Sequence, residues 1–460
     1  MNPVLEAWYE DVTAEERRRV DLYARVWAAY FSEGPKPLAV KRGKPDDNVR
    51  VNLVKLIIRT AVAYLFGKEP LFVLPSSESE GQADTATAWL NDVWTANHKM
   101  ALLQKVAMNG AACGHVFLKI LPPRRPGDYP RLVNLSPSFV QVLTDPDDVD
   151  RAVRYLIEYT TTGRKREAVS IRQSVEVDDA GRWTVTEERC VNGGHWETIQ
   201  AIRWPYDWCP IVDTQNLTLP NVYYGMADIE EDTLELNHAT NFSLSNLQRI
   251  LRYHAHPKTW GRGFTAQQFN IGADETIILP GENSELHNLE MTGDLSSLIQ
   301  LYEKLKQAVH EPTGTPEIAT GKLENAGQLS GVALEIMFAP LVQKTEEKRL
   351  LYGEMLVEIN RRLLDMGGFG SGNRVSITWP EVLPKNAMEE RQVAMMDEGL
   401  GISKETLQEK LGYDPEQERE RRETNATDFG DEILKRFDAG ADAEPVGRMA
   451  GRADERARAG

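Results

Sequence analysis

The stretch TGTPEIATGKLENAGQLSG, residues 313–331, separates two strong helical patterns. LSSLIQLYEKLKQAVH (295–310) precedes it, and VALEIMFAPLVQKTEEKRLLYGEMLVEINRRLLD (332–365) follows it. The stretch itself is mostly Gly, Thr, Ser, Asn and Gln, with few side chains to bury. Loops longer than ~12–15 residues are uncommon inside compact domains and are usually functional or disordered. The sequence therefore predicts a polar loop that needs a functional explanation.

Composition limits the class of protein. A chain of 460 residues is too long for one hydrophobic core, so we expect two to four structural units. No apolar run approaches the ~18 residues of a membrane span, and the first residues lack the apolar segment of a signal peptide. Cys113, Cys190 and Cys209 form neither a close pair nor a metal-ligand spacing. They are expected to be small core residues in a reducing compartment.

The charge balance argues against tight binding of nucleic acid. The chain has 53 basic and 70 acidic residues, which gives a net charge of −17. A protein that holds DNA tightly normally presents a basic face, whereas this chain repels a phosphate backbone on average. Any contact with DNA is therefore expected to be weak, or confined to a few local cations.

The spacing of apolar residues predicts an α+β fold with several domains. Between residues 114 and 216, apolar and polar residues alternate in segments that Gly and Asp turns separate, which predicts an antiparallel β region. Helices are predicted over residues 14–32, 48–70, 83–110 (two helices), 226–253, 294–310 and 330–365, with short strands at 71–75, 275–280 and 374–380 and short helices after residue 387.

Three of these helices carry further signals. Helix 48–70 is expected to stop at Gly67, ahead of Pro70. Pro340 lies inside helix 330–365 and should kink it, because proline removes a backbone donor and clashes with the preceding turn. Helix 226–253 is expected to have charges that suit its dipole, with acidic residues first and basic residues last. These residues are Asp228, Glu230, Glu231, Asp232, Arg249 and Arg252.

Two motif-like stretches do not fit catalytic motifs. GTPEIATGK (314–322) has six residues between its glycines instead of four, and Leu323 follows Lys322 where a phosphate loop needs Ser or Thr. GQLSG (327–331) has its Ser one place too late for a nucleophile elbow. The sequence therefore predicts no enzyme and no bound cofactor.

Three other features have ordinary structural explanations. His254 and His256 could offer two metal ligands on one face of a strand, but such a pair is more often structural. DPDD (145–148) clusters carboxylates, although Asp-Pro is also common in turns, and we expect a turn. Asn216 begins a glycosylation sequon that matters only in a secreted chain.

Five stretches of the chain, taken in order, resemble one protein family. They are NVRVNLVKLIIRTAVAYLFGKEP (48–70), DPDDVDRAVRYLIEYT (145–160), WCPIVDTQN with YGMADIEEDTLELNHATNFSLSN (208–246), LSGVALEIMFAPLVQKTEEKRLLY (329–352) and VSITWPEVLPKNAMEERQVAMMDEGLGISKETLQEKLGYDPEQERERRE (375–423). Together they resemble the portal proteins of tailed double-stranded DNA bacteriophages, head-to-tail connectors of the siphophage type. The resemblance covers residues 48–424.

The resemblance implies a division of the chain into the parts of a portal subunit. These parts are the wing at 1–225 and 330–384, stem helices at 226–253 and 294–310, a small α/β clip at 254–293, a tunnel loop at 311–329, a helical crown at 385–424 and a mobile tail at 425–460. The tunnel loop would project into a central channel, where Lys322, helped by Thr320, Asn325 and Gln328, would contact passing DNA.

The resemblance also implies partners and a location. The subunit would form a ring of about twelve copies at one capsid vertex, in the virion and, during assembly, in the host cytoplasm. Double-stranded DNA would pass through the ring without sequence specificity. A large terminase, the major capsid and scaffolding proteins, and a head-tail adaptor would bind the ring, with no membrane partner. Twelve copies would carry roughly −200 formal charges, which suits a channel that must not bind the DNA it conducts.

Two other functions remain possible from the residues alone. The chain could be a monomeric assembly or scaffold protein of the virion. It could also be a head-maturation enzyme, such as a nuclease or protease of virion assembly, although no constellation of catalytic residues supports this alternative. The native mass separates a ring from a single chain.

Overall fold

The computed structural model describes residues 3–74, 80–163, 165–178, 180–255, 259–263, 283–288, 295–320, 331–370 and 375–383, and a few positions between 395 and 419. The chain forms two compact units, 1–382 and 383–460. In the described part of the chain, no helix has the length and apolar character needed to cross a membrane.

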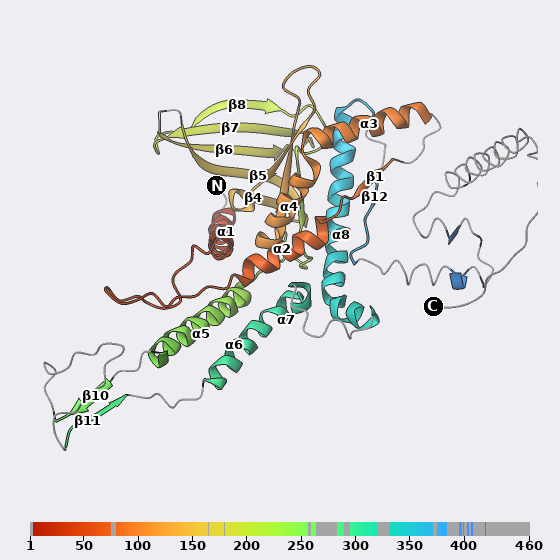
Figure 1. Ribbon diagram of the computed structural model, residues 1–460. Helices are drawn as coiled ribbons and strands as arrows, with labels where there is room; N and C mark the ends of the chain where they lie inside the picture. Colours follow the sequence, from red (N-terminus) through yellow and green to blue (C-terminus); the bar gives the residue numbers. More distant parts are fainter. Residues whose placement is uncertain are drawn as a thin grey trace, which may run out of the picture. The chain divides into compact units, whose positions relative to one another are not determined.

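The first unit combines long helices with antiparallel sheets, as the sequence predicts (Figure 1). Its strands are antiparallel to their neighbours in every pair that the structure describes. The helices are α1 (Pro3–Tyr30), α2 (Leu53–Phe66), α3 (Glu80–Ala96), α4 (Lys99–Cys113), α5 (Glu231–Ala255), α6 (Ser296–Ala308), α7 (His310–Thr313) and α8 (Gly331–Met366).

Two sheets account for the predicted β region. Neighbouring strands in the sequence are neighbours in the larger sheet, whose order is β4-β5-β6-β7-β8, and the smaller sheet has the order β3-β2-β9. The strands are β2 (His115–Leu121), β3 (Arg131–Leu135), β4 (Val140–Asp145), β5 (Asp148–Thr162), β6 (Ala168–Val177), β7 (Trp183–Val191), β8 (Glu197–Arg203) and β9 (Ile211–Gln215). The DPDD stretch is the turn between β4 and β5, where Asp145 accepts a 3.0 Å hydrogen bond from the Asp147 amide. The expected turn is confirmed.

Two further strand pairs are small. β1 (Leu71–Val73) pairs with β12 (Ser376–Thr378), which joins two predicted strands that are far apart in the sequence. β10 (Thr259–Arg262) pairs with β11 (Glu285–Asn288), and the Trp260 and His287 rings stack with centroids 5.1 Å apart. The strand predicted at 275–280 lies outside the described residues.

The largest core cluster lies between α8, the helices α2 to α4 and the smaller sheet. The C-terminal half of α8 supplies Tyr352, Leu356, Ile359 and Leu363, all fully buried. Their spacing of three or four residues places them on one face of the helix. Each such side chain contributes about 1.5–3 kcal/mol when it leaves water. This face therefore fixes α8 against the rest of the unit.

Helix α2 begins later than the sequence predicts. Residues 48–52 have no regular secondary structure, and Asn52 is the N-cap, accepting a 2.8 Å hydrogen bond from the Lys55 amide. The helix ends at Phe66 with Gly67 as its C-cap, as expected. A Cβ on Gly67 would lie 2.1 Å from the Ala63 carbonyl oxygen, so glycine is required there.

The segment before α2 is bound along α5 by a regular ladder of side chains. Ser245 exchanges two hydrogen bonds with the backbone of Val49, and Asn241 exchanges two with the backbone of Val51. Asn237 accepts a 3.3 Å hydrogen bond from the Leu53 amide. Four residues of helix advance about 6.0 Å and two residues of extended chain about 6.6 Å, so the two repeats stay in register.

Helix α5 begins at Glu231, five residues after its predicted start, and this corrects the interpretation of its charges. Glu231 and Asp232 lie in the first turn, as the dipole favours, but Asp228 precedes the helix and is buried. At the other end, Arg249 and Arg252 both contact the buried carboxylate of Asp47. Several of the predicted helix-end charges therefore serve tertiary contacts.

The expectation for the histidine pair also changes, whereas that for Pro340 does not. His254 lies in α5, so the idea of two histidine ligands on one strand is wrong, and His256 lies outside the described residues. Pro340 lies inside α8, which is helical on both sides of it. The expected kink at Pro340 stays a prediction.

Little of the second unit is described. Ser403 caps a short helical segment, because its hydroxyl accepts a 3.3 Å hydrogen bond from the Thr406 amide, and Leu407 is buried. The predicted crown (385–424) otherwise lies outside the described residues, as does the tail after residue 424.

Candidate functional site

The first half of the polar stretch 313–331 is folded, which the sequence did not predict. Residues 310–320, called the loop base below, contain α7 and a 3-10 turn over Glu317–Thr320. Thr313 and Thr315 are buried, with 2 % and 1 % of their surface exposed. Polar side chains can be buried here because each finds a local hydrogen-bond partner. The loop is therefore shorter than its composition indicates.

The predicted DNA-contacting residues are located only in part. Thr320 is the last residue of the 3-10 turn, and its side chain is not among the described ones. Lys322, Asn325 and Gln328 lie outside the described residues. Their proposed contact with DNA stays a prediction.

The loop base is held by contacts within itself and with α6. The Thr313 hydroxyl donates a 3.0 Å hydrogen bond to the Val309 carbonyl. The Nδ1 atom of His310 lies 2.8 Å from the Thr315 carbonyl oxygen, so this nitrogen carries the proton. Gly314 ends α7 in the left-handed conformation, with φ of 58°. Lys306 of α6 pairs with Glu317 at 2.7 Å.

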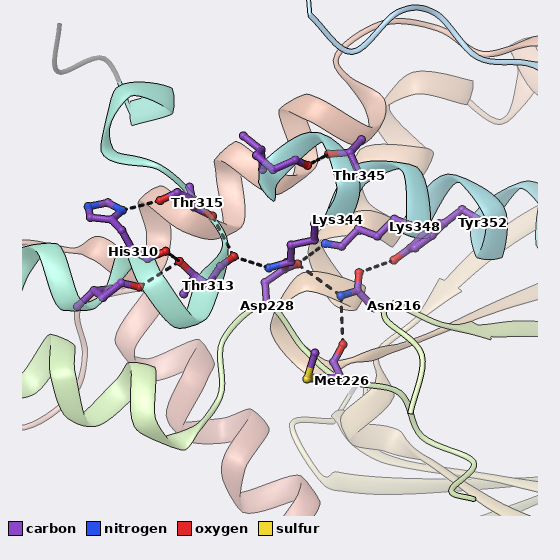
Figure 2. Close-up of polar contacts among 12 residues, drawn as sticks. Asn216, Met226, Asp228, His310, Thr313, Thr315, Lys344, Thr345, Lys348 and Tyr352 are labelled. Atoms are coloured by element: carbon purple, nitrogen blue, oxygen red, sulfur yellow. Dashed lines mark hydrogen bonds and ion pairs between the residues drawn. The ribbon is translucent and has the colours of Figure 1, made fainter. Parts of the chain in front are cut away.

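Lys344 joins the loop base to a buried carboxylate (Figure 2). Its Nζ donates a 2.7 Å hydrogen bond to the carbonyl of Thr313 and lies 2.5 Å from Oδ1 of Asp228. One ammonium group therefore contacts both the end of α7 and the segment that leads into α5.

Asp228 also pairs with Lys348, one turn further along α8. We call Asp228, Lys344 and Lys348 the charge cluster. The Asp228 side chain has no exposed surface, and those of Lys344 and Lys348 are 15 % and 3 % exposed. Asn216 supports the cluster: its Nδ2 lies 3.4 Å from Oδ2 of Asp228, and its Oδ1 accepts a 3.1 Å hydrogen bond from Tyr352.

The electrostatics of the cluster follow from burial and pairing. Burial alone would raise the pKa of Asp228, but the two ammonium groups outweigh burial and lower this pKa to about 2. Burial lowers the pKa of Lys348 to about 8, although the Asp228 carboxylate favours its charged form. Burial also raises the pKa of Tyr352 well above its usual value, so this hydroxyl remains a donor. Asp228 is therefore ionised at neutral pH.

Close backbone packing brings these residues together. The Asp228 amide donates a 2.9 Å hydrogen bond to the Ala111 carbonyl at the end of α4. A Cβ on Gly110 would lie 1.9 Å from the Tyr352 hydroxyl oxygen. A Cβ on Gly114, which has φ of +76°, would lie 2.2 Å from the Gly225 carbonyl oxygen. These glycines let the segment before α5 pass close to α4 and α8.

A second buried polar network lies between the two sheets. His115 and Tyr155 bond the two oxygens of Asp213 at 2.9 Å and 2.6 Å, and the Tyr223 hydroxyl also donates to Asp213. Burial would raise the pKa of Asp213, but these partners outweigh burial and lower it. His115 is 2 % exposed, and its Nδ1 has no partner in the described part of the chain. Because the pair of His115 and Asp213 is so enclosed, the network is better explained as a structural contact that holds the two sheets together.

The metal-ligating side chains and the cysteines of the described residues can be assessed directly. Over the described ranges, no group of three or more His, Cys, Asp or Glu side chains is placed to hold a metal ion. Cys113, Cys190 and Cys209 are all buried and free, and burial raises the pKa of Cys113 and of Cys209 to about 12. Such thiols are weak nucleophiles, because the thiolate is the reactive form.

Two long helices, α5 and α8, and the loop base thus meet at the buried charge cluster. The chain belongs to the phage portal proteins of the SPP1 Gp6-like family, whose sequence profile matches residues 40–427. This family is structural rather than enzymatic. The resemblance inferred from the five stretches is confirmed.

Solved structures support the same fold. A chain in the virion of a native gene transfer agent particle is similar, with a TM-score of 0.51 and 14 % identity, over 86 % of this chain and 99 % of that one. A chain in the neck of an empty gene transfer agent particle, computed with C6 symmetry, has a TM-score of 0.50 and 14 % identity, over 78 % of this chain and 89 % of that one. No curated protein matches this chain.

Sequence reasoning missed the charge cluster. The sequence favours Asp228 as a helix-dipole residue, because Glu230, Glu231 and Asp232 follow it within four positions. A signal was present in α8, where Lys344, Lys348 and Tyr352 follow each other at intervals of four residues. That spacing places two lysines in line with a large aromatic residue, so their face is a candidate for a buried acidic partner.

Proposed function

We propose that the chain is the subunit of a portal ring at one capsid vertex, through which DNA enters during packaging and leaves during ejection. The observation that carries this proposal is the family match over residues 40–427. In this ring α5 and α6, which pack against each other in the subunit, are the two stem helices. The β10–β11 pair belongs to the clip, residues 385–424 form the crown, and the two sheets and α8 belong to the wing.

Exposed apolar side chains on the proposed stem support assembly. They are Phe242, Leu251 and Tyr253 of α5 and Ile299 and Leu301 of α6, each at least 44 % exposed. Clusters of exposed apolar residues on a single chain commonly mark a surface that another chain covers. A head-to-tail interface between identical subunits closes into a ring when its rotation divides a full turn. The gene transfer agent neck with C6 symmetry is an assembly of this symmetric kind.

The mass of the native protein tests the ring. Twelve subunits of 51.8 kDa give about 620 kDa, and a single chain gives 51.8 kDa. Native mass spectrometry and negative-stain electron microscopy distinguish these cases. A single chain across a wide range of concentrations would favour the alternative, a monomeric assembly or scaffold protein.

Residues 311–329 are proposed as the tunnel loop that touches DNA, and the loop base contains its first part. Its contacts would be weak and directed at phosphates, with Lys322 as the main cation and Thr320, Asn325 and Gln328 as polar helpers. Phosphate attraction is screened over ~8 Å at physiological salt, so a few cations in an acidic ring hold DNA only loosely. We expect Lys322→Glu to form rings but to package less DNA per capsid.

A matched variant controls this test. Lys165 is exposed in the β5–β6 turn, so Lys165→Glu makes the same charge change away from the loop. It should assemble and package like the natural chain. If Lys322→Glu blocks ring formation instead, the loop is an interface between subunits and the proposed DNA contact is wrong.

The ring needs other proteins to complete its function. ATP hydrolysis would belong to a large terminase that docks on the clip, and a head-tail adaptor would later bind the same surface. The major capsid and scaffolding proteins would hold the ring at its vertex, so the mature protein resides in the virion. Purified rings should bring down the terminase of the same particle from a mixture of the two proteins, and a chain that lacks residues 259–288 should not.

A further inference from the structure

The charge cluster contains more cations than anions in direct contact. Two ammonium groups touch one carboxylate, and all three side chains are at least 85 % buried. Two further carboxylates interact with the lysines at longer range, Glu230 with Lys344 and Glu347 with Lys348. Glu230 is exposed, and the Oε1 atom of Glu347 accepts a 3.0 Å hydrogen bond from the Thr218 amide. Lys344 completes its direct contacts with an uncharged acceptor, the Thr313 carbonyl.

The two lysines are not equivalent. Lys348 is almost completely enclosed and contacts the Oδ2 atom of Asp228. Lys344 is more exposed and divides its contacts between Oδ1 of Asp228 and the carbonyl of Thr313. Figure 2 shows Lys344 between the loop base and Asp228. Lys344 is therefore the member of the cluster that connects it to the loop base.

We propose that Lys344 is a latch that couples the position of the loop base to the segment that begins α5. When the loop base is in place, Lys344 bonds the Thr313 carbonyl and Asp228 together. When the loop base moves away, Lys344 loses the Thr313 carbonyl and contacts Asp228 alone. This changes the electrostatic environment of residues 228–232. Displacement at one end is thus transmitted to the other through one ammonium group.

The connectivity gives this latch a consequence for the whole subunit. The loop base continues α6, because α7 begins two residues after α6 ends. Asp228 lies three residues before α5. The ends of both helices therefore meet at Lys344. The functional meaning rests on the proposed function: if α5 and α6 form the stem and the loop touches DNA, the latch lets DNA in the channel alter the stem.

A pair of substitutions separates the latch from the cluster as a whole. Lys344→Met and Lys348→Met each leave one lysine with one carboxylate, so each variant keeps a balanced buried pair. Only Lys344→Met removes the bond to Thr313. We expect hydrogen exchange of the full-length protein to be at least tenfold faster over residues 310–320 in Lys344→Met and unchanged there in Lys348→Met, because the Thr313 carbonyl loses its charged donor only in the first.

A second measurement tests coupling rather than stability. Gly314→Ala strains the left-handed end of α7, while its new methyl group meets only ordinary contacts, 3.8 Å from Cδ of Lys344. In the natural background it should speed exchange both at 310–320 and at 228–235. In the Lys344→Met background the same change should speed exchange at 310–320 only. A purely structural lysine would not produce this difference.

The outcomes are separable. The proposed latch is wrong if Lys344→Met and Lys348→Met change the exchange rate of residues 310–320 equally. It is also wrong if Gly314→Ala speeds exchange at residues 228–235 in the Lys344→Met background. Should Lys344→Met fail to fold, Lys344→Gln offers a smaller change with the same expectations. None of these measurements needs DNA, so a failed packaging assay would overturn the proposed function and leave the coupling result standing.

Discussion

Asp228 pairs with Lys348 across 120 residues of sequence, in a position with almost no access to water. The pair places the start of α5 against α8. A second lysine, Lys344, contacts the other oxygen of the same carboxylate. The balance of charge at this point therefore affects both the stability of the subunit and the arrangement of its helices.

Asp228→Asn should be strongly destabilising, because it leaves two buried ammonium groups without their carboxylate. Breaking a buried ion pair by removing one partner typically costs about 3–5 kcal/mol. We expect a loss of this size in the free energy of unfolding, measured by urea denaturation of the full chain. Adding Lys348→Met to Asp228→Asn should recover part of the loss. A double variant as unstable as the sum of its two single variants would show that the charges do not interact.

Stability at alkaline pH should depend on Lys348. The folded-state pKa of about 8 lies below the usual 10.5, so the unfolded chain binds a proton between these values that the folded chain does not. The free energy of unfolding should therefore gain a component that rises with pH from about 8 to about 10.5, by up to about 1.4 kcal/mol per unit. Lys348→Met should lack this component. Urea denaturation of both proteins across this range gives the difference, and identical slopes would contradict the prediction.

Gly110→Ala should disrupt the packing around Tyr352. The new methyl group would lie 1.9 Å from the Tyr352 hydroxyl oxygen and 2.8 Å from Oδ1 of Asn216. We expect a loss of about 3 kcal/mol or more, since core overpacking costs about 1–3 kcal/mol and a buried hydrogen bond is displaced as well. Adding Tyr352→Phe removes the closest atom and should restore part of the stability. Gly34→Ala, with nothing within 4 Å of the new Cβ, should be nearly neutral in thermal unfolding.

The ladder on α5 predicts a specific effect at Asn241. Asn241→Ala leaves both the amide and the carbonyl of Val51 without a protein partner. We expect a loss of about 1–3 kcal/mol, although alanine itself favours the helix. Gln248→Ala, on an exposed position of the same helix, should change stability by less than about 0.5 kcal/mol. Equal effects of the two substitutions in urea denaturation would mean that the ladder does not hold the segment.

The sequence alone determined the family, the α+β class and most of the secondary structure. The period of two in residues 114–216 predicts strands because successive side chains point to opposite faces of a sheet. The end of α2 at Gly67 could likewise be predicted locally, because the backbone chemistry of a helix end does not depend on distant residues. Family membership was inferred from the order of five sequence stretches, and this inference needs no knowledge of the three-dimensional structure.

Only the tertiary structure decided where the polar residues act. A polar stretch such as TGTPEIATG predicts exposure by composition, yet Thr313 and Thr315 are buried because their local hydrogen bonds are satisfied. Nothing in the local sequence distinguishes Asn237, Asn241 and Ser245 from other polar helix residues. Their role as hydrogen-bond partners depends on the segment around Val49, which lies beside them in the fold. Asp228 becomes a buried anion only because α8 brings Lys344 and Lys348 to it. Long-range pairs of this kind depend on how distant segments meet, and the local pattern of a sequence does not contain that information.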